Sequence, residues 1–301
     1  MFSNQKAKLN AGDLLLLVIA AFWGATYLVV KELGNAGSIS GLMAIRFVVA
    51  AAGLWAYWFF HRSPFTKAEW LLGVAFGVSQ TLVLNLEAYS VHFTSATNGG
   101  LIIALAIVTV PILESAWRKN WLPYQFFIAT LIALIGLFLL IMGNGFVKPN
   151  IGDLLMLVAM VLRTFHFVIL GRTTQGKPVS PANLTTVMVT TSGVLMLVTN
   201  PIAAWQTASN YNGYDWSLMI FLSLFCTSFA FIGMNWAVKH TSASRTSLLL
   251  GTEPIWSTIL ATVLGGELIG PVGVLGALLI VGGTYWGQAL EAKHRNQQNQ
   301  A

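Results

Sequence analysis

Apolar stretches of about twenty residues recur from one end of this 301-residue chain to the other. An α-helix rises about 1.5 Å per residue, so a stretch of that length is what a helix needs to cross a hydrocarbon core about 30 Å thick. Charged residues make up only 9% of the chain, whereas a soluble domain carries roughly 25%, so they are too few to cover a globule in water. The sequence therefore predicts an all-α integral membrane protein.

Polar residues and Gly or Pro breaks divide the apolar sequence into ten segments, and each is predicted to form a transmembrane helix. The first apolar run, Leu14 to Val30, is longer than the core of a signal peptide, so we expect it to remain as a helix. Connections as short as Val91 to Thr94 require the helices that they join to lie antiparallel and side by side. The ten predicted helices span residues 12–32, 38–60, 68–91, 94–116, 122–143, 151–171, 181–203, 216–238, 244–264 and 270–290.

The distribution of basic residues indicates the orientation of these helices. If the amino terminus is cytoplasmic, twelve of the sixteen Lys and Arg residues fall on the cytoplasmic side, and only Lys31 and Lys148 fall outside. Short cytoplasmic loops are normally enriched in Lys and Arg. We therefore expect a multi-pass protein with both termini in the cytoplasm, the polar ends being residues 1–11 and 291–301.

The sequence lacks the residue patterns of several functional classes. The net charge of +6 comes from residues scattered singly between apolar runs, so no nucleic-acid partner is expected. Cys226 is the only cysteine, which excludes an intrachain disulfide and a thiolate metal cluster. The histidines show no HExxH spacing, and no GxxxxGK[ST] loop is present for nucleotide phosphates. We therefore expect no metal, no cofactor and no enzymatic activity.

Two sequence patterns occur twice, in the same order. Residues 12–16 read GDLLL at the start of the first predicted helix, and residues 152–156 read GDLLM at the start of the sixth. Residues 94–97 read TSAT before the fourth helix, and residues 241–244 read TSAS before the ninth. Matches at offsets of 140 and 147 residues indicate that the chain arose by internal duplication.

The duplication predicts two five-helix repeats, over residues 12–143 and 150–290. Because each repeat contains an odd number of helices, the second enters the membrane from the opposite face, and the two repeats are inverted. Inverted repeats are typical of secondary transporters, which bind substrate near the membrane midplane and expose it alternately to either side.

Several short motifs follow one another along the chain: Phe22-Trp23-Gly24, Arg46-Phe47, residues 89–96, residues 241–254 and Gly266-Glu267. In this order they resemble the drug/metabolite transporter superfamily and, within it, the EamA-type ten-helix carriers. The resemblance covers nearly the whole chain and implies a protein of the bacterial inner membrane, in contact with lipid, that carries a small-molecule substrate as a monomer or homodimer. The sixth helix departs from the family, which usually has a Trp where this chain reads Arg163-Thr164-Phe165-His166.

Charged side chains inside the membrane are the first candidates for function, because each costs at least about 2.5 to 3.5 kcal/mol to insert. For Arg46 we expect an ion pair or carbonyl contacts that hold helices together. Glu253 lies near mid-membrane and is followed by Pro254, so it either pairs with an arginine or takes part in substrate or proton binding. Glu87, near the outer end of the third helix, is either a solvated helix end or part of an outer gate.

Arg163 lies about eleven residues inside the sixth helix, where the first repeat carries Trp23. We expect Glu253 to neutralise Arg163 in the empty protein and a substrate carboxylate to do so in the loaded one, because a guanidinium binds carboxylates in bidentate fashion. His166, three residues further on, would lie on the same helical face. The alternative is that Arg163 permanently bridges two helices.

Trp23 and Trp256 lie deep inside their helices, unlike most of the eleven tryptophans, which are placed at the membrane interfaces. Either they pack in the core, or they form walls for an aromatic or cationic ligand. The candidate substrate-binding residues are therefore Arg163, His166, Glu253, Trp23 and Trp256.

These observations favour a secondary transporter that exports small metabolites, such as amino acids, by alternating access. A proton-coupled multidrug or other metabolite carrier is an alternative, although its small relatives rely on a carboxylate in the first helix, where this chain has Trp23 and Thr26. A membrane-embedded enzyme and a channel are further alternatives. The substrate, the coupling ion and the direction of transport are not encoded in any motif that we identify.

Overall fold

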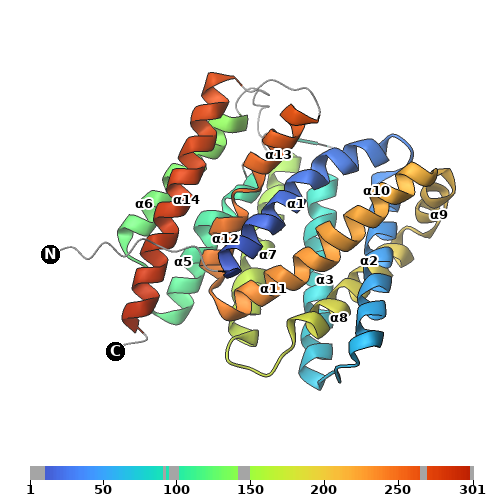
Figure 1. The fold of residues 1–301 in the computed structure, drawn as a ribbon, viewed down its shortest axis with the longest axis horizontal. Coiled ribbons are helices and arrows are strands. Elements are labelled where there is room, and N and C mark those ends of the chain that lie inside the picture. The colour runs from blue at the N-terminus through green and yellow to red at the C-terminus, as the bar shows by residue number, and fades with distance from the viewer. Residues whose placement is uncertain (1–10, 91–92, 95–101, 142–149, 265–269, 299–301) are drawn as a thin grey trace.

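The computed structural model describes residues 11–90, 93–94, 102–141, 150–264 and 270–298, and all regular structure within these ranges is helical (Figure 1). The elements are α1 (Ala11–Gly34), α2 (Ile39–His61), α3 (Lys67–Ser90), α5 (Ala106–Arg118), α6 (Tyr124–Ile141), α7 (Ile151–Thr174), α8 (Pro181–Thr199), α9 (Pro201–Asn210), α10 (Gly213–Ser223), the π-helical turn η2 (Leu224–Phe229), α11 (Ala230–His240), α12 (Ala243–Leu250), α13 (Glu253–Val263) and α14 (Pro271–Gln298).

Seven helical stretches are long and apolar enough to cross a membrane, and α6 contributes a shorter apolar helix. Many of their outward side chains are bulky and apolar, such as Leu71 and Val198, which are 74% and 71% exposed and so require lipid around them. Each of the ten predicted helices overlaps at least one observed helix, and the all-α membrane fold is confirmed. The seven stretches are Ala11–Gly34, Ile39–His61, Lys67–Ser90, Ile151–Thr174, Pro181–Thr199, Gly213–His240 and Pro271–Arg295.

The predicted ninth helix is broken into α12 and α13. Pro254 has no N–H to donate, and it occupies the first turn of α13, where a helix needs no such donor. The break places Glu253 at the amino-terminal end of α13, where the helix dipole stabilises a negative charge. The predicted fourth helix is represented by α5, and residues 95–101 of that prediction lie outside the described part of the chain.

Helix packing follows the duplication. Helix α3 packs on α7, and correspondingly α11 packs on α1; likewise α1 packs on α12 and α13, and α7 packs on α5. Helices α2 and α8 pack on each other, as do α6 and α14, so each of these pairs joins a helix to its counterpart in the other half. The pair α6 and α14 lies at one side of the molecule (Figure 1). Exchanging the halves therefore preserves the packing scheme, as expected of two repeats.

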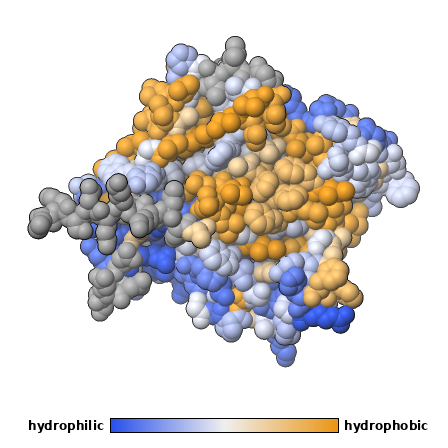
Figure 2. All heavy atoms as spheres, in the orientation of Figure 1, coloured by the Kyte–Doolittle hydropathy of each residue, from blue (hydrophilic) through white to orange (hydrophobic). Residues whose placement is uncertain are grey.

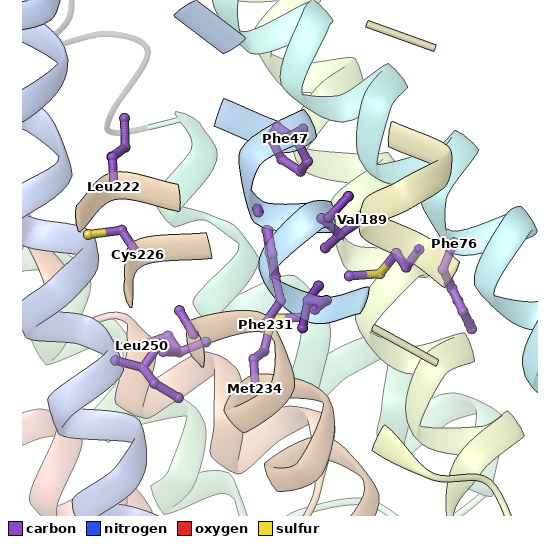
Figure 3. Packing of buried hydrophobic residues seen from close by; sticks show 14 of the residues in the cluster. Phe47, Phe76, Val189, Leu222, Cys226, Phe231, Met234 and Leu250 are labelled. Atoms are coloured by element: carbon purple, nitrogen blue, oxygen red, sulfur yellow. The ribbon is translucent and has the colours of Figure 1, made fainter. Parts of the chain in front are cut away.

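The hydrophobic core joins the two halves. Phe47 of α2, Val189 of α8 and Phe231 of α11 belong to one buried cluster, together with Leu250 of α12 (Figure 3). On the surface, apolar side chains gather in a belt across the middle of the face seen in Figure 2, with polar side chains toward its lower edge and around α9. This belt is the surface that lipid would cover.

Candidate functional site

Four side chains from four helices form a polar cluster inside the helix bundle. Arg163 of α7 lies twelve residues after the first residue of α7, or about 18 Å along it, and its Nη2 atom is 2.5 Å from Oε1 of Glu87 on α3. The Tyr27 hydroxyl of α1 faces the Glu253 carboxylate of α13, to which it can donate. Tyr27 and Glu253 also interact electrostatically with both Arg163 and Glu87. We call these four residues the central cluster.

The central cluster is accessible from between the helices. The side chain of Tyr27 is 59% exposed, although it interacts with residues from three other helices. The side chains of Arg163 and Glu87 are 29% and 20% exposed, respectively. A small solute that reaches these exposed surfaces would meet a guanidinium, a phenol hydroxyl and two carboxylates.

The expectation that Glu253 neutralises Arg163 is wrong, because Glu87 makes the direct ion pair. Packing of α3 on α7 brings Glu87 to Arg163, whereas packing of α1 on α13 brings Tyr27 to Glu253. Within the described residues, no Lys or Arg lies at ion-pair distance from Glu253. Its carboxylate is held instead by the Tyr27 hydroxyl and by the amino-terminal end of α13.

His166 does not join the central cluster. It is 4% exposed, its Nδ1 lies 3.2 Å from the Ser79 hydroxyl, and its ring centroid lies 5.0 Å from that of Phe76. Both partners are on α3, so His166 fastens α7 to α3. Its Nε2 atom is buried and has no hydrogen-bond partner among the described residues. A direct contact between His166 and a ligand stays a prediction.

Trp23 and Arg46 bind the same backbone carbonyl in the π-helical turn η2. The Trp23 indole donates to the Cys226 oxygen at 3.0 Å, and Arg46 donates to it at 3.3 Å and to the Thr227 hydroxyl at 2.7 Å. In an α-helix the N–H of Ala230 would occupy that carbonyl, but here it bonds the Phe225 and Thr227 oxygens. The wider turn thus frees the carbonyl, and the predicted helix-joining role of Arg46 is confirmed.

Trp256 packs where α1 and α13 come closest. A methyl group on Gly24 would lie 2.8 Å from Cβ of Trp256 and 2.6 Å from the backbone nitrogen of Ser257, so only glycine permits this approach. Tyr27 and Glu253 are each three residues from these contacts, on the same two helices. The close approach therefore sets the distance between two members of the central cluster.

A second polar cluster closes the end of the bundle that is predicted to be cytoplasmic. Arg245 of α12 is buried and donates to both carboxylate oxygens of Asp13 on α1, from Nε at 2.8 Å and from Nη2 at 2.7 Å. Its Nη1 lies 3.1 Å from the Glu291 carboxylate of α14. Next to it, the Ser244 N–H and hydroxyl donate to Glu114 of α5 at 2.7 and 2.5 Å. We call these five residues the inner network.

The inner network is not predicted from the sequence, because Arg245 has the sequence character of a basic residue in a cytoplasmic loop. A signal was available: Asp13 belongs to the repeated GDLL pattern, and Arg245 directly follows the repeated TSAS pattern. The corresponding aspartate of the second half, Asp153, accepts instead from the Thr94 hydroxyl and from the N–H of Asn150. Among the described residues, no group of three or more His, Cys, Asp or Glu could hold a metal ion.

Comparisons with known proteins agree with this architecture. The chain is 25% identical over 271 residues to an uncharacterized transporter of Archaeoglobus fulgidus, covering 89% of this chain and 83% of that protein. It is 26% identical to the uncharacterized transporter YyaM of Bacillus subtilis, covering 89% and 90% of the two chains. A crystal structure with 18% sequence identity superposes with a TM-score of 0.79, covering 94% of this chain and 98% of that one, and so shares its fold.

The family model of EamA-like transporters matches this chain twice, over residues 10–142 and 150–286. These two matches together cover nearly the whole sequence, and each contains five of the predicted helices. The chain therefore belongs to the EamA-like transporter family, within the drug/metabolite transporter superfamily.

Proposed function

We propose that this transporter exports small zwitterionic metabolites, such as amino acids, from the cytoplasm by alternating access. The observation that carries the proposal is the central cluster. It contains the Arg163 guanidinium and, on a neighbouring helix, the Glu253 carboxylate, which has no arginine at ion-pair distance among the described residues. A zwitterion presents the complementary pair of charges at a short, fixed separation.

Each end of such a ligand has a matching partner. Arg163 offers a planar set of N–H donors that suits bidentate binding of a ligand carboxylate, and Glu87 contacts it through one of them only. Glu253 is free to accept from a ligand ammonium, with the Tyr27 hydroxyl beside it. We assign Trp23 and Trp256 to the walls of the site and His166 to its support from α3.

The two polar clusters support alternating access. The inner network joins α1, α5, α12 and α14 through buried charges, so it closes one end of the bundle while the central cluster stays accessible. To release a path toward that end, Arg245 must separate from Asp13 and Glu291. We propose that residues 12–143 and 150–290 are the two rocking repeats, in a bacterial inner membrane with both termini cytoplasmic.

A proton-coupled carrier of drugs or other metabolites is the second candidate. The observation that favours it is Glu253, a carboxylate inside the bundle with no cation at ion-pair distance among the described residues. Such a group can exchange a proton as its surroundings change during transport. Transport by this mechanism would depend on an imposed pH gradient, and Glu253→Gln would abolish that dependence.

The experiment is uptake into inverted vesicles of the twenty L-amino acids, their carboxamides and their decarboxylated amines. We expect the free acids to be carried and the carboxamides to be carried poorly, because the amide loses the charge that Arg163 recognises. Arg163→Lys keeps the positive charge but loses the paired N–H donors of the planar guanidinium. The apparent affinity for free acids should therefore fall about tenfold while the purified protein stays folded. Equal transport of acids and carboxamides, or an unchanged affinity, would refute the zwitterion proposal.

A further inference from the structure

We infer that the Glu87 side chain competes with the substrate carboxylate for Arg163. It forms an ion pair with Arg163 in the empty transporter and is displaced when a carboxylate ligand binds. This inference rests on the proposed function, since it requires Arg163 to be the carboxylate-binding group. It makes Glu87 of α3 a residue that determines specificity, and it explains why a charged side chain lies at this position.

The geometry of the ion pair fits a displaceable contact. Arg163 and Glu87 are joined by one contact, Nη2 to Oε1, and both side chains are partly exposed. The Arg245 pair is different, because two N–H groups of Arg245 bind both oxygens of Asp13 and both residues are buried. A single, partly exposed contact can be exchanged for a bidentate one with an incoming carboxylate. The Arg245 guanidinium is buried, so an incoming carboxylate cannot reach it in the same way.

Glu87 is not needed to hold α3 against α7. On one side of it along α3, Ser79 contacts the His166 ring, and Phe76 packs against the same ring. On the other side, the Ser90 hydroxyl lies 3.9 Å from the sulfur of Met156. The two helices are therefore fastened at both ends of the segment that contains Glu87, and the carboxylate is available for another role.

The charge of Glu87 has a specific use in a carrier that must return empty. After substrate leaves, Arg163 would be an unpaired cation inside the membrane, and an unpaired charge there disfavours the closing movement that removes water from it. Pairing with Glu87 neutralises Arg163 and so allows the empty transporter to change between the states open to the two sides of the membrane. When substrate is bound, its own carboxylate neutralises Arg163, and Glu87 is not required for the same movement.

The first test is the affinity of Glu87→Gln for the same panel of L-amino acids, measured by calorimetry on purified protein. If Glu87 occupies Arg163 about nine-tenths of the time, removing this competitor should tighten binding of free acids about tenfold. Glu32→Gln is the control, since it removes an exposed carboxylate of α1 outside the central cluster, and it should leave binding unchanged. Weaker or unchanged binding by Glu87→Gln would overturn the inference.

The second test compares two transport modes in proteoliposomes. Glu87→Gln should retain exchange of internal for external amino acid, in which the carrier crosses loaded, but lose at least about tenfold in net efflux, in which it returns empty. The double variant Glu87→Gln with Arg163→Gln removes both charges. Its net efflux of carboxamides, which do not need Arg163, should therefore exceed that of the single variant, and the preference for free acids over carboxamides should be lost. This double variant also tests the inference if the single variant does not fold.

Equal loss of exchange and net efflux in Glu87→Gln would show that Glu87 is structural and would overturn the inference. So would a double variant that stays as defective in net efflux as the single one. Failure of the proposed function gives a different result: the parent protein would bind no free acid in preference to its carboxamide, whatever residue stands at position 87.

Discussion

Breaking the inner network should open the end of the transporter that we propose to be cytoplasmic, and Asp13→Asn is the smallest change that does so. In the parent, Arg245 makes two charge-assisted hydrogen bonds to the Asp13 carboxylate, at 2.8 and 2.7 Å. Asparagine keeps one oxygen, so one bond survives without its negative charge, and the other N–H of Arg245 meets an amide N–H₂. Losing one such bond costs roughly 1.5 to 3 kcal/mol.

If about 2 kcal/mol of that loss falls on the closed state, the population open to the cytoplasm should rise about 30-fold, because each 1.4 kcal/mol is a factor of ten. The assay is labelling of a cysteine at Ser247, a buried position two residues beyond Arg245, by a membrane-impermeant maleimide in inverted vesicles. The native thiol is first removed by Cys226→Ser, whose hydroxyl can still donate to the Phe22 carbonyl. Asp13→Asn should raise the labelling rate by up to about 30-fold.

The matched control for this experiment is Asp153→Asn, at the equivalent position of the other half. Asp153 accepts from the Thr94 hydroxyl and from a backbone N–H, at the opposite end of the bundle. Its loss should leave cytoplasmic labelling at Ser247 unchanged. Labelling of Asp13→Asn at the parent rate, or an equal rise in both variants, would refute the reasoning that the inner network is the closure.

Three further predictions test other parts of the structure. Gly24→Ala should lower the melting temperature of the purified protein, because its methyl group would lie 2.6 Å from a backbone nitrogen of α13, whereas Gly282→Ala, with no atom within 4 Å of the added carbon, should not. Burial raises the pKa of Tyr211 from 10.0 to about 12, so the stability that its neutral hydroxyl contributes is fully present below pH 10 and is lost as the pH rises to about 12; melting curves of Tyr211→Phe should lack this decline. Reporter fusions after Gln206 should report the outside and fusions at Ala301 the cytoplasm, and the opposite pattern would reverse the proposed orientation.

Much of the fold follows from hydrophobicity alone, because a helix in lipid must be apolar over a length that the bilayer sets. The same argument located Arg46, which lies too deep in its helix to reach water and so must bind another helix. It also singled out Glu253, which is followed by Pro254, although the ninth helix was predicted to be continuous and the structure breaks it at this point.

The pairing within the central cluster could not be predicted from the sequence in the same way. Helical periodicity shows which residues share a face of one helix, but it does not show which helices meet or how each is rotated. Glu253 was the expected partner of Arg163, and the packing of α3 on α7 brings Glu87 there instead. Tyr27 was not identified, because a tyrosine in the outer half of a helix has the sequence character of an interface anchor.

The equivalence of Trp23 and Arg163 has a consequence for how such a site can arise. Two identical subunits in antiparallel association must present the same side chain twice, so their shared site is symmetric and cannot distinguish one end of a ligand from the other. Here the duplicated positions have diverged: one holds an indole bonded to a backbone carbonyl, and the other holds a cation in an ion pair. For the proposed function, a single chain with two different halves can therefore bind the two ends of one ligand with different side chains.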